Sequence, residues 1–205
     1  DWGICEISLS GGVPLFEALR QQDHLYSVLE KGADGHQAIV VGAVHESLHR
    51  KLEGIAAVLE KLAEPQVAIV SMTITEKGYC IEPGSGRLDR QHPGIVADLA
   101  WPHQPQTVPG ILVEALRLRR ERGLPAFSLL SCDNIPENGH VLRRAVLDLA
   151  QARDPSLADW IATAATFPCT MVDRIVPAAT PATLDEIAAA LGGVRDECAI
   201  ACEPF

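Results

Sequence analysis

The chain has 205 residues, of which 47% are hydrophobic and 4% aromatic, so it can bury one sizeable core, and a single domain is the default expectation. Its formal charge of −10 and pI near 5.1 exclude a basic nucleic-acid-binding surface and favour a small-molecule partner. Six cysteines are scattered singly, without a CxxC pair, which is typical of a reduced cytoplasmic protein, and no apolar run reaches the roughly 20 residues of a membrane span.

Hydrophobic periodicity predicts regular elements along the whole chain. In the first half these are a strand at 1–9, a helix at 14–22, strands at 25–30 and 37–44, a helix at 52–62 and a strand at 66–71. In the second half they are helices at 93–100 and 108–122, a strand at 127–130, helices at 139–153 and 157–164, a strand and loop at 167–177 and a last helix that starts after Thr180. This alternation indicates an α/β fold with a largely parallel sheet and flanking helices.

The loop at 131–139 is the first candidate for a ligand-binding segment, because it leaves the carboxyl end of a buried strand and opens a helix. Within it, the amide of Asn134 offers two donors and one acceptor without charge, which suits a hydroxyl or a developing oxyanion. The alternative interpretation is that Asp133, Asn134 and Asn138 are turn and N-cap residues.

Two further polar loops follow predicted strands. Hydroxyls on Ser71, Thr73 and Thr75 suit ribose or phosphate oxygens, and Glu76 adds a titratable group at the same edge, although alternating threonines also fit an edge strand. In the third loop, Asp173 is either the surface ion-pair partner of Arg174 or a carboxylate directed at a polyhydroxylated ligand. These loops place the candidate site at one edge of the sheet.

The sequence His45-Glu46-Ser47-Leu48-His49 matches the H-E-x-x-H motif, in which two histidines one helical turn apart bind zinc. Because His45 directly follows a predicted strand, the five residues need not be helical, and no third ligand is evident. A zinc hydrolase that uses His45, Glu46 and His49 therefore stays open as an alternative of another class. Neither a dinucleotide-binding G-x-G-x-x-G motif nor a P-loop occurs.

The segments 71–79, 131–139 and 167–177, in this order, resemble the long-chain mannitol dehydrogenase family, and the resemblance spans the whole chain. It implies a Rossmann-type NAD-binding domain over 1–205, metal-independent hydride transfer at a secondary alcohol or ketone, and a sugar acid or polyol as substrate. Residues 1–6 and 201–205 favour the branch that interconverts D-fructuronate and D-mannonate. Mannitol or arabinitol oxidation is the alternative within the family, and a non-catalytic binding module is the alternative outside it.

The resemblance also implies roles for individual residues. Asn134 matches the family asparagine that helps to hold the reacting oxygen, Asp173 an aspartate that lines the site, and Glu76 a glutamate near the proton exit path. The residues that it assigns to the cofactor contact are Ser71, Met72, Thr73, Cys132 and Asn134.

Three parts of the family pattern are missing from the 205 residues. The glycine-rich phosphate loop is expected before Asp1, and the catalytic lysine and the helical substrate domain after Phe205, so we expect an interior piece of a longer enzyme that turns over no substrate by itself. The acidic residue that normally binds the adenosine ribose has no counterpart in 8–12, and Glu6 lies inside the first strand. The expectation of NAD, with NADP as alternative, therefore rests on the resemblance.

Overall fold

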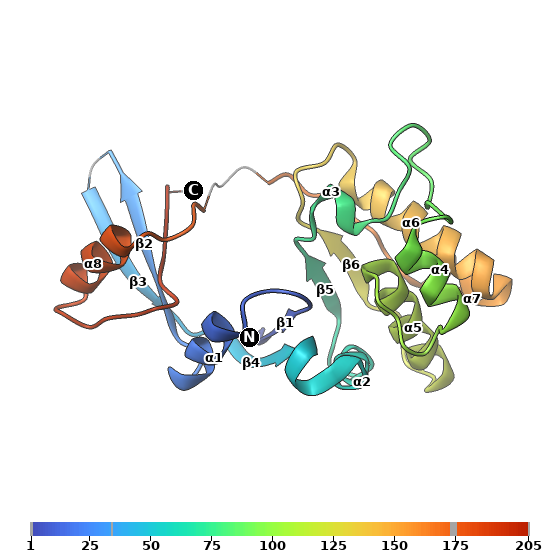
Figure 1. Cartoon of the computed structure of the whole chain (residues 1–205), viewed down its shortest axis with the longest axis horizontal. Coiled ribbons are helices and arrows are strands. Elements are labelled where there is room, and N and C mark those ends of the chain that lie inside the picture. The colour runs from blue at the N-terminus through green and yellow to red at the C-terminus, as the bar shows by residue number, and fades with distance from the viewer. Residues whose placement is uncertain (1, 34, 173–175, 205) are drawn as a thin grey trace. The chain divides into compact units, whose positions relative to one another are not determined.

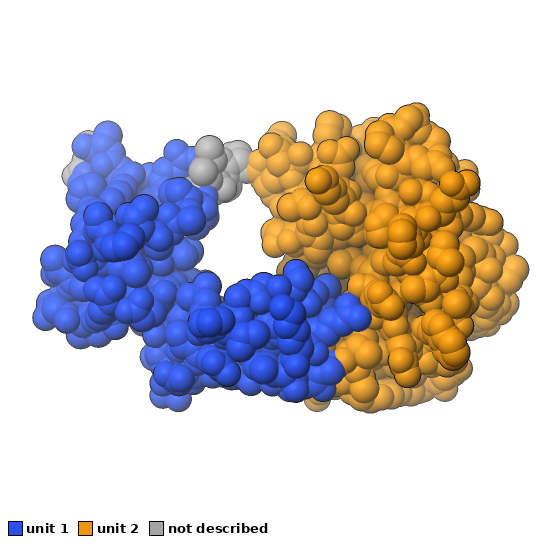
Figure 2. Space-filling view, in the orientation of Figure 1, with its two compact units in different colours: residues 1–54, 173–205 blue, residues 55–172 orange. Residues whose placement is uncertain are grey.

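The computed structural model describes residues 2–33, 35–172 and 176–204 and divides the chain into two compact units (Figures 1 and 2). Unit 1 comprises Asp1–Gly54 and Asp173–Phe205, and unit 2 comprises Ile55–Val172. The first boundary falls inside α2 (Arg50–Leu62), where Gly54 has a φ of 82° and interrupts the helix. Glycine adopts this conformation readily because it has no Cβ, so the sequence permits a change of helix direction at this point.

Where the structure describes it, unit 1 is built from short paired strands, two helices and the first part of α2. Its elements are β1 (Ile4–Ser8), α1 (Val13–Gln21), β2 (Tyr26–Gly32), β3 (Gly35–Val41), β4 (Val44–His49), α8 (Pro181–Ala190) and β7 (Ile200–Cys202). Strand β1 pairs in parallel with β4, β2 pairs antiparallel with β3, and β7 pairs in parallel with β2. Leu29 of β2 packs with Ile187 of α8 and Ala201 of β7, so residues far apart in the sequence form one core.

Unit 2 holds one parallel strand pair and the longer helices. Its elements, besides the second part of α2, are β5 (Ile69–Met72), α3 (Thr75–Gly78), α4 (Pro93–Ala100), α5 (Val108–Glu121), β6 (Ser128–Ser131), α6 (Asn138–Arg153) and α7 (Pro155–Ala164). Strands β5 and β6 pair in register from Ile69 opposite Ser128 to Met72 opposite Ser131. Helix α6 packs against β6 on one side and against α5 and α7 on others (Figure 1).

Most of the predicted elements are confirmed, and the caps explain where helices start. Thr180 accepts a hydrogen bond from the Thr183 amide at 3.2 Å and Pro181 opens α8, while Thr107 caps α5 through the Gly110 amide at 3.1 Å. Strand β7 was not predicted, because three residues carry little periodicity and its partner β2 lies about 170 positions earlier, counting from Ile200 to Val28.

The strand predicted within 167–177 is wrong for the residues that the structure describes, since 167–172 and 176–177 form no strand. The carbonyl of Thr166 does accept a hydrogen bond from the Leu129 amide at 2.9 Å. Pro168 then has no amide hydrogen to offer, and the Thr170 amide donates to the side chain of Asn138 at 3.0 Å instead of to a neighbouring strand. The segment is therefore held to β6 by side chains.

The H-E-x-x-H motif lies in strand β4, so its helical zinc-binding geometry is absent and the interpretation as a zinc hydrolase is wrong. Residues four apart in a strand are separated by about 13 Å, too far for both to bind one ion. His45 is exposed, whereas His49 is fully buried and packs edge-on against Phe16. His49 Nδ1 also accepts a hydrogen bond from the Lys51 amide at 3.1 Å, so His49 caps α2.

Candidate functional site

The carboxyl ends of β5 and β6 lie together in unit 2. The Cys132 amide donates to the Met72 carbonyl at 2.8 Å, which extends the parallel pairing by one step beyond the strands. The loop that follows Met72 and the loop that follows Ser131 therefore leave the sheet side by side. This is the edge at which open parallel sheets place their ligands.

The side chain of Asp133 connects these two loops through hydrogen bonds. It is buried, and its carboxylate accepts hydrogen bonds from the amides of Ile74 at 3.1 Å and Thr75 at 2.9 Å and from the Tyr79 hydroxyl at 2.6 Å. The Tyr79 oxygen also lies 2.5 Å from the hydroxyl of Ser131, the last residue of β6. Burial, and then the hydrogen bond to Asp133, raise the pKa of Tyr79, so this hydroxyl keeps its proton at neutral pH.

Asn138 joins the third loop to the other two. Its buried side-chain amide donates to the Asp133 carbonyl at 3.0 Å and to the Thr170 hydroxyl at 2.9 Å, and its Oδ1 accepts from the Thr170 amide at 3.0 Å. The Thr170 hydroxyl in turn donates to the Ser131 carbonyl at 2.7 Å. All three polar loops predicted from the sequence therefore meet at one edge, as far as residue 172.

The start of α6 lies unusually close to the third loop. A Cβ placed on Gly139 would lie 2.5 Å from the Pro168 carbonyl oxygen and 2.6 Å from that of Phe167, well inside contact distance. Both neighbours are backbone atoms and cannot swing away. Glycine at this position thus allows the approach on which the hydrogen bonds between Asn138 and Thr170 depend.

Four of the predicted site residues are exposed at this edge. The side chains of Asn134, Glu76, Ser71 and Thr73 make no hydrogen bond with any residue that the structure describes. Their donors and acceptors are consequently available to a ligand. In contrast to Asp133 and Asn138, Asn134 serves neither as a helix cap nor as a tie between loops.

The other predicted contacts are more enclosed. Met72 is buried with 9% of its surface exposed, and its carbonyl is already bonded to Cys132. Burial, and then the neighbouring charge of Asp133, raise the pKa of the half-buried Cys132 thiol, so it is protonated at neutral pH and is a poor nucleophile. Asp173 lies outside the described residues, and its role stays a prediction.

Sequence reasoning treated Asp133 and Asn138 as possible turn residues and did not single out Tyr79. The available signal was the spacing of Ser131 and Asp133, because residues two apart at the end of a strand point to the same face. Tyr79 offered no signal of this kind, since its partner lies 54 positions away in the sequence.

Glu6, the acidic residue of the first strand, faces the packing of unit 1. Its Oε2 atom is buried and has no hydrogen-bond partner among the described residues. Burial raises the pKa of Glu6, while the nearby His24, His49 and Arg20 partly offset that rise. A ligand cannot reach this buried oxygen, although Glu6 as a whole is only half-buried.

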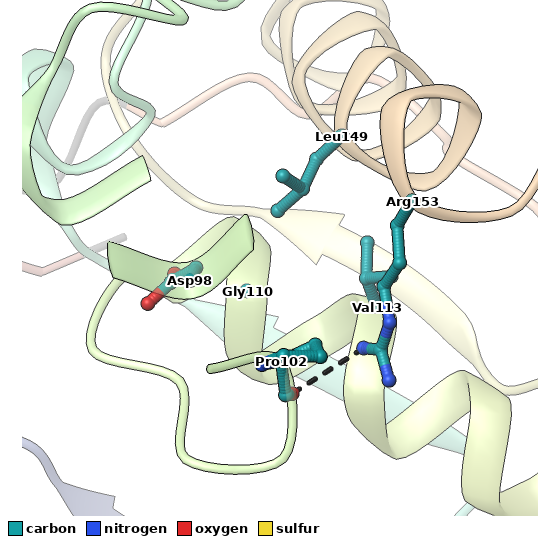
Figure 3. A pocket seen from close by; sticks show the side chains of 6 residues that line it. All are labelled: Asp98, Pro102, Gly110, Val113, Leu149 and Arg153. Atoms are coloured by element: carbon teal, nitrogen blue, oxygen red, sulfur yellow. Dashed lines mark hydrogen bonds between the residues drawn. The ribbon is translucent and has the colours of Figure 1, made fainter. Parts of the chain in front are cut away.

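Unit 2 also contains a narrow crevice (Figure 3). It is lined by Asp98, Pro102, Gly110, Val113, Leu149 and Arg153 and is too narrow to admit a water molecule. The buried carboxylate of Asp98 accepts from the Gln106 amide at 2.6 Å and from the Thr107 amide and hydroxyl at 3.1 and 2.5 Å. The hydrogen bonds to Asp98 fix the start of α5, so the crevice results from side-chain packing and offers no room for a ligand.

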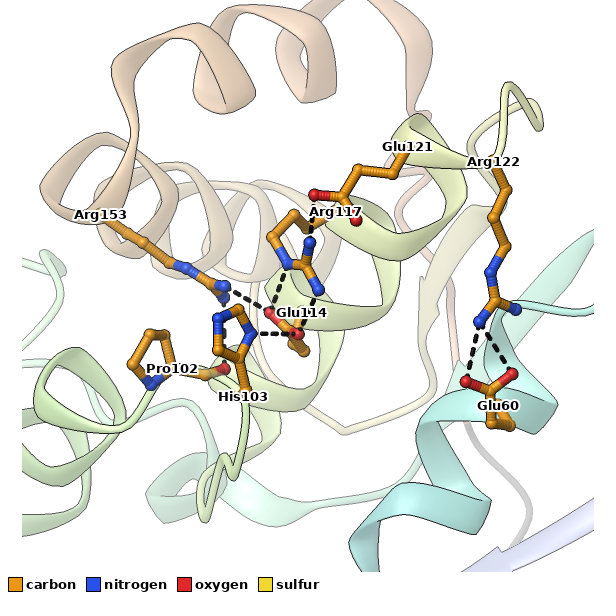
Figure 4. A network of polar contacts seen from close by, with 8 residues as sticks. All are labelled: Glu60, Pro102, His103, Glu114, Arg117, Glu121, Arg122 and Arg153. Atoms are coloured by element: carbon orange, nitrogen blue, oxygen red, sulfur yellow. Dashed lines mark hydrogen bonds and ion pairs between the residues drawn. The ribbon is translucent and has the colours of Figure 1, made fainter.

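A charged network fastens α5 to α6 (Figure 4). Glu114 is 2% exposed and accepts hydrogen bonds from Arg117 at 2.7 and 2.9 Å, from His103 at 2.8 Å and from Arg153 at 2.5 Å. Burial by itself would raise the pKa of Glu114, but the hydrogen bonds from the three partners outweigh it and the pKa is lowered. Because α6 begins at Asn138, this network also steadies the helix that ties the loops together.

Comparison with known proteins identifies the family. The sequence profile of the mannitol dehydrogenase Rossmann domain matches residues 1–205. The chain belongs to the mannitol dehydrogenase family. This mannitol dehydrogenase family chain is 63% identical over 205 residues to an uncharacterised oxidoreductase, YeiQ, and 58% identical over 207 residues to D-mannonate oxidoreductase, both of Escherichia coli K12.

A solved relative supports the Rossmann-type fold. The structure of Pseudomonas fluorescens mannitol 2-dehydrogenase, in a ternary complex with NAD and D-mannitol, superposes with a TM-score of 0.93 at 39% identity and covers the whole of this chain. The predicted Rossmann-type α/β fold is thereby confirmed. The family chain spans 42% of that structure and 42% of each of the two curated relatives. Among the described residues, no helix is long and apolar enough to cross a membrane.

Proposed function

We propose that this chain is the Rossmann-type domain of an NAD-dependent oxidoreductase that interconverts D-fructuronate and D-mannonate by hydride transfer. The 58% identity to a protein named D-mannonate oxidoreductase supports this substrate pair, against 39% to the mannitol 2-dehydrogenase of known structure. Because the chain spans 42% of these relatives, the activity is proposed for the polypeptide that contains it.

The observation that carries the proposal is the state of Asn134. Its side-chain amide is exposed and makes no hydrogen bond to the described residues, at the point where three polar loops meet. The backbone on either side of it is held, because the Asp133 carboxylate accepts from the Ile74 amide and the Asp133 carbonyl accepts from the Asn138 side chain. An uncharged donor on a backbone that is held in this way suits an oxygen that gains negative charge as an alcohol is oxidised.

The side chains at this edge also fit a dinucleotide. The hydroxyls of Ser71 and Thr73 are exposed and make no hydrogen bond to the described residues, so they can bind ribose or amide oxygens of the cofactor. When bound, NAD supplies the acceptor or donor of the hydride. The protein's own task is then to hold the carbinol carbon close to the cofactor and to transfer the hydroxyl proton to or from the substrate.

Two side chains are proposed for these tasks. Asn134 donates its amide hydrogens to the reacting oxygen and so favours the alkoxide-like transition state. Glu76, exposed in α3, exchanges the proton with solvent, and Asp173 is proposed to line the sugar site. The general base itself is proposed to come from the lysine that the family carries outside these 205 residues.

A second candidate is oxidation of a polyol such as D-mannitol. The similarity to the mannitol 2-dehydrogenase complex favours it, because that protein shares the fold of this chain over its whole length and holds NAD and D-mannitol. Both candidates share the proposed roles of Asn134 and Glu76, and they differ only in the substrate's carboxylate.

The test is NADH consumption by the natural full-length polypeptide, with D-fructuronate and D-fructose offered in parallel. Clear preference for fructuronate supports the proposal, preference for fructose supports the polyol alternative, and inactivity with both refutes the proposal. Replacing Asn134 by Ala is expected to lower kcat by about 100-fold, as for the loss of one oxyanion donor. The matched control is Gln151→Ala, which removes an exposed amide from α6 and should leave kcat unchanged.

A further inference from the structure

We propose that Tyr79 and Asp133 are positioning residues that set Glu76 and Asn134 in their working geometry through one buried carboxylate. The inference rests on the proposed function and adds to it two residues that contact neither substrate nor cofactor. It follows from the way in which the carboxylate is shared between the loops after β5 and β6.

The hydroxyl of Tyr79 lies in a buried chain of hydrogen bonds. Tyr79 has none of its surface exposed, and its oxygen lies between Ser131 Oγ at 2.5 Å and Asp133 Oδ2 at 2.6 Å. Since the carboxylate can only accept, the tyrosine donates to Asp133 and the serine donates to the tyrosine. Such chains strengthen each member, and the low local dielectric makes an unpaired member costly.

The same carboxylate holds a strained turn ahead of Glu76. Thr75 has a φ of 62°, a left-handed conformation that is unfavourable for a β-branched residue. The Asp133 carboxylate accepts hydrogen bonds from the amides of Ile74 and Thr75 and thereby keeps the turn in this conformation. Helix α3, which carries Glu76, starts at Thr75, so relaxation of the turn would move Glu76.

Asp133 controls the other loop through its own backbone. It directly precedes Asn134, and its carbonyl accepts hydrogen bonds from the Ile135 amide at 2.8 Å and from the Asn138 side chain at 3.0 Å. The backbone on both sides of Asn134 is therefore tied to Asp133. A shift of this residue would displace Asn134 and Glu76 together, and a displacement of about 1 Å can cost about 100-fold in rate.

The experiment is Tyr79→Phe in the full-length polypeptide, which removes one oxygen and keeps the ring. We expect kcat for the ketone to fall by about tenfold to 100-fold, while KM changes less than about threefold, because ground-state binding does not need the aligned oxyanion donor. The isotope effect on kcat with NADH deuterated at C4 should exceed that of the wild type, because hydride transfer becomes the slow step.

Two controls separate positioning from a general loss of stability. Tyr26→Phe makes the same chemical change at a tyrosine whose hydroxyl has no hydrogen bond to the described residues, and it should behave as wild type. Ile161→Val removes one methylene from the core beneath α7 and lowers stability without touching the loops. Both variants are assayed per folded enzyme, with the folded fraction measured by circular dichroism.

The outcomes distinguish this inference from the proposed function. If the wild type turns over no sugar substrate, the proposed function fails and the positioning role fails with it. If the wild type is active but Tyr79→Phe keeps kcat within about twofold, the positioning inference alone is overturned. It is also overturned if Ile161→Val shows the same loss and neither variant changes the isotope effect.

Discussion

Replacement of Glu114 by Gln tests the network that holds α5 against α6 (Figure 4). The change keeps the shape of the side chain but replaces one carboxylate oxygen by an amide nitrogen. That nitrogen cannot accept hydrogen bonds, so it leaves either Arg153 and one nitrogen of Arg117, or His103 and the other nitrogen of Arg117, without an acceptor. It also removes the negative charge that balances the two guanidinium groups.

The size of the effect follows from the burial of the partners. Glu114 is 2% exposed, and the side chains of Arg153 and Arg117 are only 13% and 20% exposed, so water replaces the lost acceptor poorly. Breaking a buried ion pair costs about 3–5 kcal/mol, and the partial exposure of the arginines favours the lower end, so we expect the free energy of unfolding to fall by about 3 kcal/mol.

Acidification should remove the same stabilisation from the wild type. The pKa of Glu114 is lowered in the folded protein from its ordinary value of 4.5, so its contribution is complete above that value and is lost as the pH falls through the lower, folded-state pKa. The difference in unfolding free energy between wild type and Glu114→Gln should consequently be largest at neutral pH and shrink below 4.5.

The assay is urea unfolding, followed by the fluorescence of Trp101 and Trp160, which both lie in unit 2. The control is Glu121→Gln, the same chemical change at a carboxylate that also pairs with Arg117 but is 61% exposed, for which we expect a loss of no more than about 1 kcal/mol. Equal losses in the two variants, or a difference from wild type that does not depend on pH, would refute the reasoning.

Two further predictions concern stability. Gly139→Ala forces a Cβ to within 2.6 Å of two carbonyl oxygens and should lower the free energy of unfolding, measured by heat or urea, by at least about 2 kcal/mol. Gly84→Ala, whose Cβ meets no atom within 4 Å, should lower it little, and similar losses for both variants would contradict the close approach at Gly139. Arg119→Met leaves the carbonyls of Leu62, Glu64 and Pro125 without their donor and should cost about 3 kcal/mol, so a fully stable variant would show that water satisfies them.

The case of Arg119 shows where pattern reading reaches its limit. Near the end of α5, Arg122 is exposed and paired with Glu60 at 2.8 Å. Arg119, in the same run, is 1% exposed and binds only backbone carbonyls and the face of the Phe127 ring. Helical periodicity cannot separate the two, because a long apolar stem can bury an arginine wherever acceptors converge.

By itself, the sequence determined the local elements and their order. Caps such as Thr180 and Thr107, proline at helix starts and apolar runs such as 127–130 act through near neighbours in the chain, and they placed the longer helices correctly, although the short α3 was read as part of a loop. The same local reading was enough to doubt the zinc motif, because the run before His45 already predicted a strand. The family resemblance likewise rests on the loops as written in the sequence.

Only the tertiary structure decided which polar side chains form hydrogen bonds within the protein and which remain available to a ligand. Asp133 and Asn134 are neighbours of similar shape, yet the Asp133 carboxylate accepts hydrogen bonds from amides 58 and 59 positions away, while Asn134 remains exposed. The short strand β7 and the close approach at Gly139 also depend on partners distant in sequence. The physical reason is that burial and hydrogen-bond satisfaction are properties of three-dimensional neighbours, and these are set by packing that no local pattern encodes.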